Sequence, residues 1–151
     1  MVIFEIKMKI NPGFGLENIL FGMKQSDVEA IYGKPSRRYK DDENNEIYLY
    51  NQEKLRLTFY EDENYRLGYI LTSNPDSVLL GHKVIGSQIA MAIEKFRDHG
   101  LKDWERENID LSTNHFNEEK WIILEEEFGI IVKVEIGAII KDDAFEWKYG
   151  K

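Results

Sequence analysis

The sequence predicts an α+β fold of two helix-plus-antiparallel-meander repeats that share one sheet, with the helices packed on one face. Residues 22–35 have the pattern of a short amphipathic helix with marked ends, and period-two apolar runs follow it. Later in the chain, Val78 to Gly81 (Val-Leu-Leu-Gly) echoes Ile19 to Gly22 (Ile-Leu-Phe-Gly). Together these observations indicate two related halves, each a helix followed by strands.

We therefore expect one domain over residues 1–151. Its halves span about residues 14–74 and 78–140, preceded by a strand over 2–10 and followed by a tail over 141–151. The strand is predicted because apolar residues alternate with polar ones from Val2 to Ile10.

The first helix has two possible starts. Ser26 and Glu29 fit a capping box, in which each side chain satisfies a free backbone donor. A start near Lys24 would instead place Asp27 in the first turn, where its charge suits the helix dipole. Both versions end at the same place, because Gly33 suits a left-handed cap and Pro35 prevents continuation.

Three antiparallel strands are expected after this helix, centred on residues 47–50, 55–60 and 67–71. Alternation divides their side chains between two faces. The face toward the helix is expected to hold Ile47, Leu49, Leu55, Leu57 and Phe59. The opposite, outward face is expected to hold Tyr48, Tyr50, Arg56, Thr58 and Tyr60.

The second half begins after the turn-rich residues 73–77. Ser87 is the expected N-cap of a helix running to about His99, with a buried stripe of Ile89, Ala92, Ile93 and Phe96. Strands are expected over residues 104–112, 120–125 and 130–136. The polar tail contains Phe145, Trp147 and Tyr149, and these aromatic residues indicate that it docks on another surface rather than remaining free.

Composition limits the classes of partner. Hydrophobic residues make up 42% of the 151-residue chain, enough to form a core, so global disorder is not expected. The net charge of −8 repels phosphate backbones and anionic lipids, so we expect neither nucleic acid nor membrane as a partner. A basic protein partner would be attracted, although acidity that serves only solubility is the simpler interpretation.

The chain has no cysteine, which excludes disulfides, thiolate metal sites and cysteine nucleophiles. The first ten residues lack a basic leader and a continuous apolar run, so we expect no signal peptide. A transmembrane helix would need about 18 consecutive apolar residues, and no segment approaches this length. We therefore predict a cytoplasmic protein.

A family resemblance rests on residues 19–23 (Ile-Leu-Phe-Gly-Met), followed by Val28, Ile31, Gly33 and Pro35. This stretch resembles the SmpA/OmlA (BamE) pattern, and the two-copy layout resembles the β-lactamase inhibitor protein architecture. The resemblance implies a soluble bacterial protein-binding scaffold, a group that includes proteins like the immunity partners of secreted toxins. Lys24 departs from the pattern's threonine and no lipoprotein cysteine is present, so an outer-membrane assembly role is not implied.

No motif indicates catalysis or metal binding. The histidines His82, His99 and His115 have no metal-ligand spacing, and the acidic residues 41–43 and 61–63 lack the pattern of an EF-hand. The glycine pair of residues 13–15 lacks the third glycine of a dinucleotide loop. We therefore predict no cofactor, no metal and no catalytic residues.

The outward sheet face remains as the candidate site. The predicted partner-binding residues are Tyr48, Tyr50, Arg56, Tyr60, Trp121 and Lys133, with Ile123 and Ile131 beside them. Tyrosine, tryptophan and arginine are enriched at interface hot spots, whereas solvent-facing strands favour threonine, lysine and glutamate. The alternative is that the tail or the N-terminal strand covers this face as a second small core, and burial distinguishes the two.

Three functions are compatible with the sequence. The first is a non-enzymatic protein-binding module, such as an immunity protein that neutralises a basic toxin domain through its aromatic face. The second is a small-ligand-binding protein or enzyme with an unrecognised pocket. The third is a structural subunit that dimerises through the same face, and the sequence leaves the oligomeric state open.

Overall fold

The computed structural model describes residues 8–150. The strand predicted over residues 2–10 therefore lies mostly outside the described residues, and the structure shows a strand, β1, at Lys9–Asn11.

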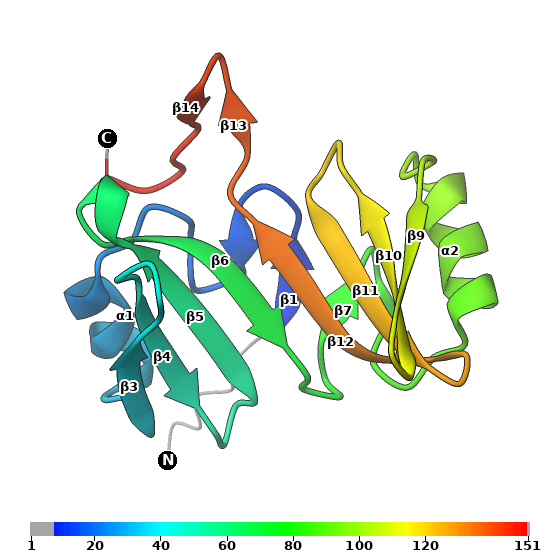
Figure 1. Ribbon diagram of the computed structural model, residues 1–151, viewed down its shortest axis with the longest axis horizontal. Coiled ribbons are helices and arrows are strands. Elements are labelled where there is room, and N and C mark those ends of the chain that lie inside the picture. Colours follow the sequence, from blue (N-terminus) through cyan, green and yellow to red (C-terminus); the bar gives the residue numbers. More distant parts are fainter. Residues whose placement is uncertain (1–7, 151) are drawn as a thin grey trace.

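Eight strands form one antiparallel sheet (Figure 1). In spatial order they are β3 (Arg37–Lys40), β4 (Glu46–Tyr50), β5 (Leu55–Tyr60), β6 (Arg66–Thr72), β12 (Ile130–Gly137), β11 (Ile122–Glu127), β10 (Ser112–Asn117) and β9 (Glu105–Ile109). Strands β3 to β6 form one meander and β9 to β12 form another. The two meanders join where β6 pairs with β12.

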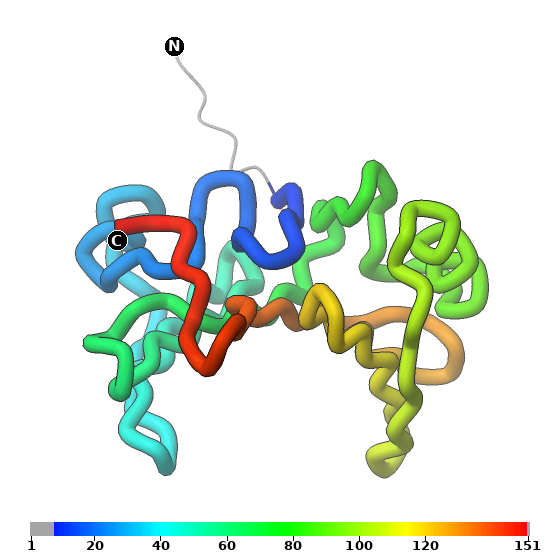
Figure 2. Tube along the Cα trace, turned by 90° about the horizontal axis from the view of Figure 1, so that it is seen from above, coloured from blue at the N-terminus to red at the C-terminus, as the bar shows by residue number. Residues whose placement is uncertain are grey.

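The sheet is arched, and one of its faces is covered (Figure 2). Helices α1 (Gln25–Tyr32) and α2 (Ile89–Asp98) lie at the two ends of the convex face. A small sheet of β2 (Gly15–Leu16), β1, β7 (Val78–Leu79) and β8 (His82–Lys83) lies between them. The core fills the space between these layers, and its largest buried members include Phe21, Phe59 and Phe96. We call the opposite side of the eight-stranded sheet the concave face.

The predicted α+β class with helix-plus-meander repeats is wrong. Strands account for 43% of the residues and helices for 15%, so the protein is mostly β. The prediction omitted β3 and merged β9 with part of β10 into one strand. Every residue of β3 and β9 is exposed, because both are edge strands of the sheet. An edge strand with two solvated sides has no apolar alternation, so its sequence shows no strand period.

Helix α1 adopts the earlier of its two predicted starts. Lys24 is the N-cap, and its backbone N–H donates to the carboxylate of Asp27 at 2.9 Å. Gly33 ends the helix with φ of 79°, and its N–H donates to the carbonyl of Glu29. In α2 the N-cap is Gln88 rather than the predicted Ser87, whose hydroxyl donates to a carbonyl in the preceding turn.

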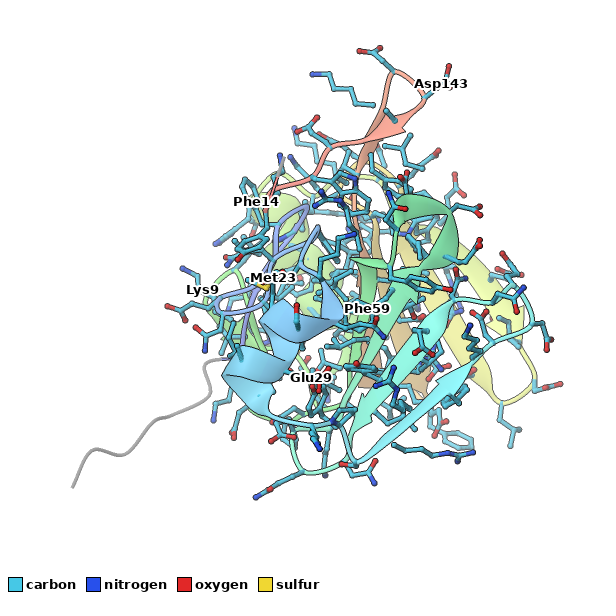
Figure 3. The ribbon with its side chains drawn as sticks, turned by 90° about the vertical axis from the view of Figure 1, so that its left-hand side faces the viewer. Lys9, Phe14, Met23, Glu29, Phe59 and Asp143 are labelled. Carbon is cyan, nitrogen blue, oxygen red and sulfur yellow. The ribbon has the colours of Figure 1, made fainter. Side chains whose placement is uncertain are left out.

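The C-terminal tail docks, as its aromatic residues predicted. After the hairpin β13 (Ile140–Lys141) and β14 (Ala144–Phe145), Trp147 packs against the core. The backbone amides of Lys148 and Tyr149 both donate to the carbonyl of Phe21. Figure 3 shows Asp143 near the tip of the projecting hairpin.

Gly22 is required by this docking. Its φ is 104°, and a Cβ there would lie 2.5 Å from the carbonyl oxygen of Tyr149. The guanidinium of Arg66 donates to the carbonyls of both Gly22 and Tyr149, which fixes the tail against the turn before α1. The glycine therefore allows a close approach between two distant parts of the chain.

Replacing Gly22 with alanine should lower the free energy of unfolding by about 3 kcal/mol, because the new methyl group adds a collision with the tail to the backbone strain. The control is Gly81→Ala, which has a similar positive φ of 76° but open space around its Cβ. This control substitution should lower the free energy of unfolding by only about 1 kcal/mol. Urea denaturation of both variants measures the difference, and equal losses would contradict a role for the close approach.

Candidate functional site

One row of side chains crosses the concave face from edge to edge. Each member is the cross-strand partner of the next, so all lie on one face. The row, which we call the central row, consists of Arg37, Leu49, Arg56, Leu71, Glu135, Ile123, Phe116 and Glu105. None of these residues is buried, although four of them are large and apolar. The row therefore combines four accessible apolar side chains with four charged ones.

Charge is divided along this row. Arg37 and Arg56 belong to the meander of β3 to β6, whereas Glu105 and Glu135 belong to the meander of β9 to β12. A neighbouring row on the second meander adds Glu107 and Glu125. The first half of the concave face is basic and the second half is largely acidic, so the face can discriminate the orientation of a charged partner.

Two predicted site residues, Tyr48 and Tyr50, are in the core instead. Their exposed fractions are 0% and 2%, and their cross-strand partners are Leu57 and Leu55. The predicted faces of β4 are therefore wrong by one residue. The reason is that α1 accommodates the hydroxyl groups: Tyr48 donates to the Glu29 carboxylate, and Tyr50 to a carbonyl at the end of the helix, each at 2.8 Å. Figure 3 shows Glu29 on α1 in front of the sheet.

The other predicted residues lie on the concave side. Arg56 is in the central row, and Lys133 is exposed and pairs with Glu125 at 3.6 Å. Tyr60 and Trp121 line a common hollow at the end of the sheet where the tail begins. Ile131, expected beside them, is fully buried, because a β-bulge at residues 125–126 shifts the register of β12. The predicted set is therefore divided between the concave face and the core.

Several concave-face residues were missed by the sequence argument. Leu49 was assigned to the helix side because β4 is apolar on both faces, so its period could not distinguish them. Phe116 belongs to β10, which was not recognised as a separate strand. Leu71 was placed in a strand, but its face became clear only from its pairing with Arg56 and Glu135.

A histidine and a glutamate also form a largely buried pair. His115 lies 3.2 Å from the carboxylate of Glu126, on the covered side of the sheet near α2. Arg97 and Arg106 line the same groove, which has a volume of about 340 Å³. Within residues 8–150, no group of three histidine, aspartate or glutamate side chains could hold a metal ion. None of the described helices is long and apolar enough to cross a membrane.

Comparison with known proteins finds similarity in structure alone. No family model matches the chain, and no curated protein matches its sequence. An extracellular protein containing an SCP domain from Bacillus anthracis str. Ames has a TM-score of 0.51 and 14% identity, covering 89% of this chain and 49% of its own. A cysteine-rich secretory protein from Staphylococcus aureus has a TM-score of 0.51 and 11% identity, covering 97% of this chain and 59% of its own.

The chain thus spans about half the length of one similar structure and less than two thirds of the other. At these identities the likeness concerns the fold alone. It nevertheless corrects the resemblance to SmpA/OmlA and β-lactamase inhibitor proteins, which leaves the immunity-protein interpretation without support. The motif over residues 19–35 describes a capped helix and its stop, which unrelated folds can share. The predicted cytoplasmic location also conflicts with similar structures described as extracellular or secretory.

Replacing Tyr48 with phenylalanine tests its structural role. Removing the hydrogen bond to Glu29 should lower the free energy of unfolding at pH 7 by about 1.5 kcal/mol. Burial, followed by the hydrogen bond to Glu29, raises the pKa of Tyr48 to about 12, from an ordinary value near 10. The neutral hydroxyl therefore stabilises the fold below pH 10, and this contribution is lost as the pH rises toward 12.

The variant should consequently lose less stability than the wild type between pH 10 and pH 12, as measured by urea denaturation at each pH. Tyr39→Phe is the matched control, because Tyr39 is exposed on an edge strand. Its substitution should change neither the free energy of unfolding at pH 7 nor the stability lost between pH 10 and pH 12. Parallel alkaline curves for Tyr48→Phe and the wild type would contradict this assignment.

Proposed function

We propose that this chain is a non-enzymatic protein-binding domain whose concave face holds the convex surface of a folded partner. The observation that carries the proposal is the one-sided covering of the sheet. The convex face is covered by α1, α2 and the small sheet, whereas the central row leaves Leu49, Leu71, Ile123 and Phe116 partly accessible. Accessible apolar groups beside charged ones are typical of protein-interaction sites.

Charge complementarity defines the partner. A surface that fits the concave face would carry basic residues opposite Glu105, Glu107 and Glu135, and acidic residues opposite Arg37 and Arg56. The net charge of −8 further favours a partner with a basic surface by long-range attraction. The extracellular and secretory descriptions of the two similar structures support a partner met outside the cytoplasm.

A second copy of this chain is the competing occupant. A two-fold axis parallel to the strands would place the basic half of one concave face over the acidic half of the other. Light scattering on the purified protein separates the two cases, since the proposal requires a monomer at micromolar concentration. A stable dimer that Arg56→Glu dissociates would instead identify the face as a dimer interface.

A photo-cross-linking amino acid at Phe116 should capture the partner, and the same amino acid at Met91 is the control on the exposed surface of α2. Mass spectrometry identifies the captured partner, which is then purified. It should bind the Ile123→Asp and Arg56→Glu variants about thirtyfold more weakly than the wild type, because losing a hot-spot residue costs about 2 kcal/mol of binding free energy. Met91→Asp should bind as the wild type does.

Thermal denaturation first establishes that each variant folds. If Ile123→Asp does not fold, Arg56→Glu still provides the test, because Arg56 is partly exposed. Capture from Met91 equal to that from Phe116, or unchanged affinity in both concave-face variants, would overturn the proposal.

A further inference from the structure

A hollow with aromatic walls lies on the concave side, where β6 and β12 meet the tail hairpin. Its volume is about 380 Å³, which is within the range of small-ligand sites. We call it the aromatic pocket. Its walls hold four aromatic rings, those of Tyr60, Tyr69, Trp121 and Phe145, and two carboxylates, those of Glu118 and Glu119.

Two glycines in the sheet leave the space in which two of these rings lie. A Cβ on Gly68 would lie 2.1 Å from the ring of Tyr60, and a Cβ on Gly137 would lie 2.3 Å from the ring of Trp121. Each ring therefore lies directly over a glycine, in space that any other residue would fill. The atoms closest to both Cβ positions are ring atoms of Tyr60 and Trp121, so the rings occupy space that is free only because these two positions are glycine.

The backbone of Trp121 is unfavourable for such a large residue. It has φ of 52°, in the left-handed region that glycine and asparagine normally occupy. The corresponding turn of the first meander, residues 51–54, ends with Lys54 at φ of 56°, so the turn itself does not require an aromatic side chain. Trp121 is also 39% exposed and contributes little to the core. Its ring lies over Gly137 and packs edge-on against Phe116, and the part of the ring that stays exposed is available to a ligand.

The charge of the aromatic pocket selects the ligand class. Its only charged lining residues are Glu118 and Glu119, both exposed, and no lysine, arginine or histidine lines it. The hydroxyl of Tyr69 already donates to Glu135 at 2.9 Å, which leaves its ring as the available surface. A wider adjacent groove of about 720 Å³ is also lined by Arg97 and Lys102, so it lacks this preference for positive charge.

We propose that the aromatic pocket binds an alkylammonium cation, such as a choline head group or a lysine side chain. The electron-rich faces of tyrosine and tryptophan attract such cations, and their methyl or methylene groups are sheltered by Ile139, Ile140 and Phe145. Glu118 and Glu119 add attraction at the rim. This site takes a small cation rather than a folded partner, although it adjoins the central row, because the ring of Trp121 lies edge-on to the ring of Phe116 with 5.0 Å between their centroids.

Titration with choline, followed by the indole N–H signal of Trp121 in NMR spectra, tests the site. We expect saturable binding, and at least tenfold weaker binding of the uncharged isostere in which carbon replaces the nitrogen. Nα-acetyl-lysine amide and phosphocholine, titrated in parallel, distinguish a protein side chain from a lipid head group as the source of the cation.

Trp121→Leu keeps an apolar side chain but removes the indole, so choline binding, followed calorimetrically, should weaken at least tenfold. The double variant Glu118→Gln with Glu119→Gln should bind a few times more weakly at low salt, with less difference at high salt because rim charges are screened. Glu127→Gln, an exposed carboxylate outside the pocket, is the matched control and should not change affinity.

Equal binding of choline and its uncharged isostere would overturn the proposal, as would the absence of saturable shifts at Trp121. The comparison of the two ligands uses the wild-type protein, so the test stands even if Trp121→Leu fails to fold.

Discussion

The pairing of β6 with β12 is the interaction on which the rest of the structure depends. It aligns residues 69–72 with residues 134–137 in antiparallel register and thereby makes one sheet from two meanders. The central row is continuous only because Leu71 and Glu135 face each other across this junction. The pair of Tyr69 and Gly137, two positions further along, lines the aromatic pocket. Both proposed binding surfaces therefore depend on the same few hydrogen bonds.

The covering of one face explains why the other is free to bind. The convex face buries its apolar residues under α1, α2 and the small sheet, and Tyr48 and Tyr50 find hydroxyl partners at α1. Residues of the concave face contribute less to the core, because they remain partly solvated. They can therefore carry charge and exposed apolar groups at a lower cost in stability. The tail docks beside Gly22 at one end and leaves the central row open.

Features that depend on residues close together in the sequence could be predicted, whereas features that depend on distant residues could not. Local signals located α1, with its stop at Gly33, and the docking of the aromatic tail. The faces of β4 could not be predicted, since tyrosine and aliphatic residues alternate there and either set can be buried. Ile131 was placed on the wrong face because β12 carries an extra residue, Val132, between the partners of Glu125 and Glu126, and this reversed the orientation of Ile131. The edge strands had no pattern at all, because both sides of each strand are solvated.

By itself, the sequence determined that the chain can form a core, that its surface is acidic, where the first helix ends and that the aromatic tail docks. These features follow from side-chain type and short spacing. Tertiary structure alone decided that the protein is mostly β, that Tyr48 and Tyr50 are buried, and that Tyr60 and Trp121 line one pocket. The physical reason is that strand pairing joins residues far apart in the chain, and one bulge or one hydroxyl partner decides which face a side chain takes.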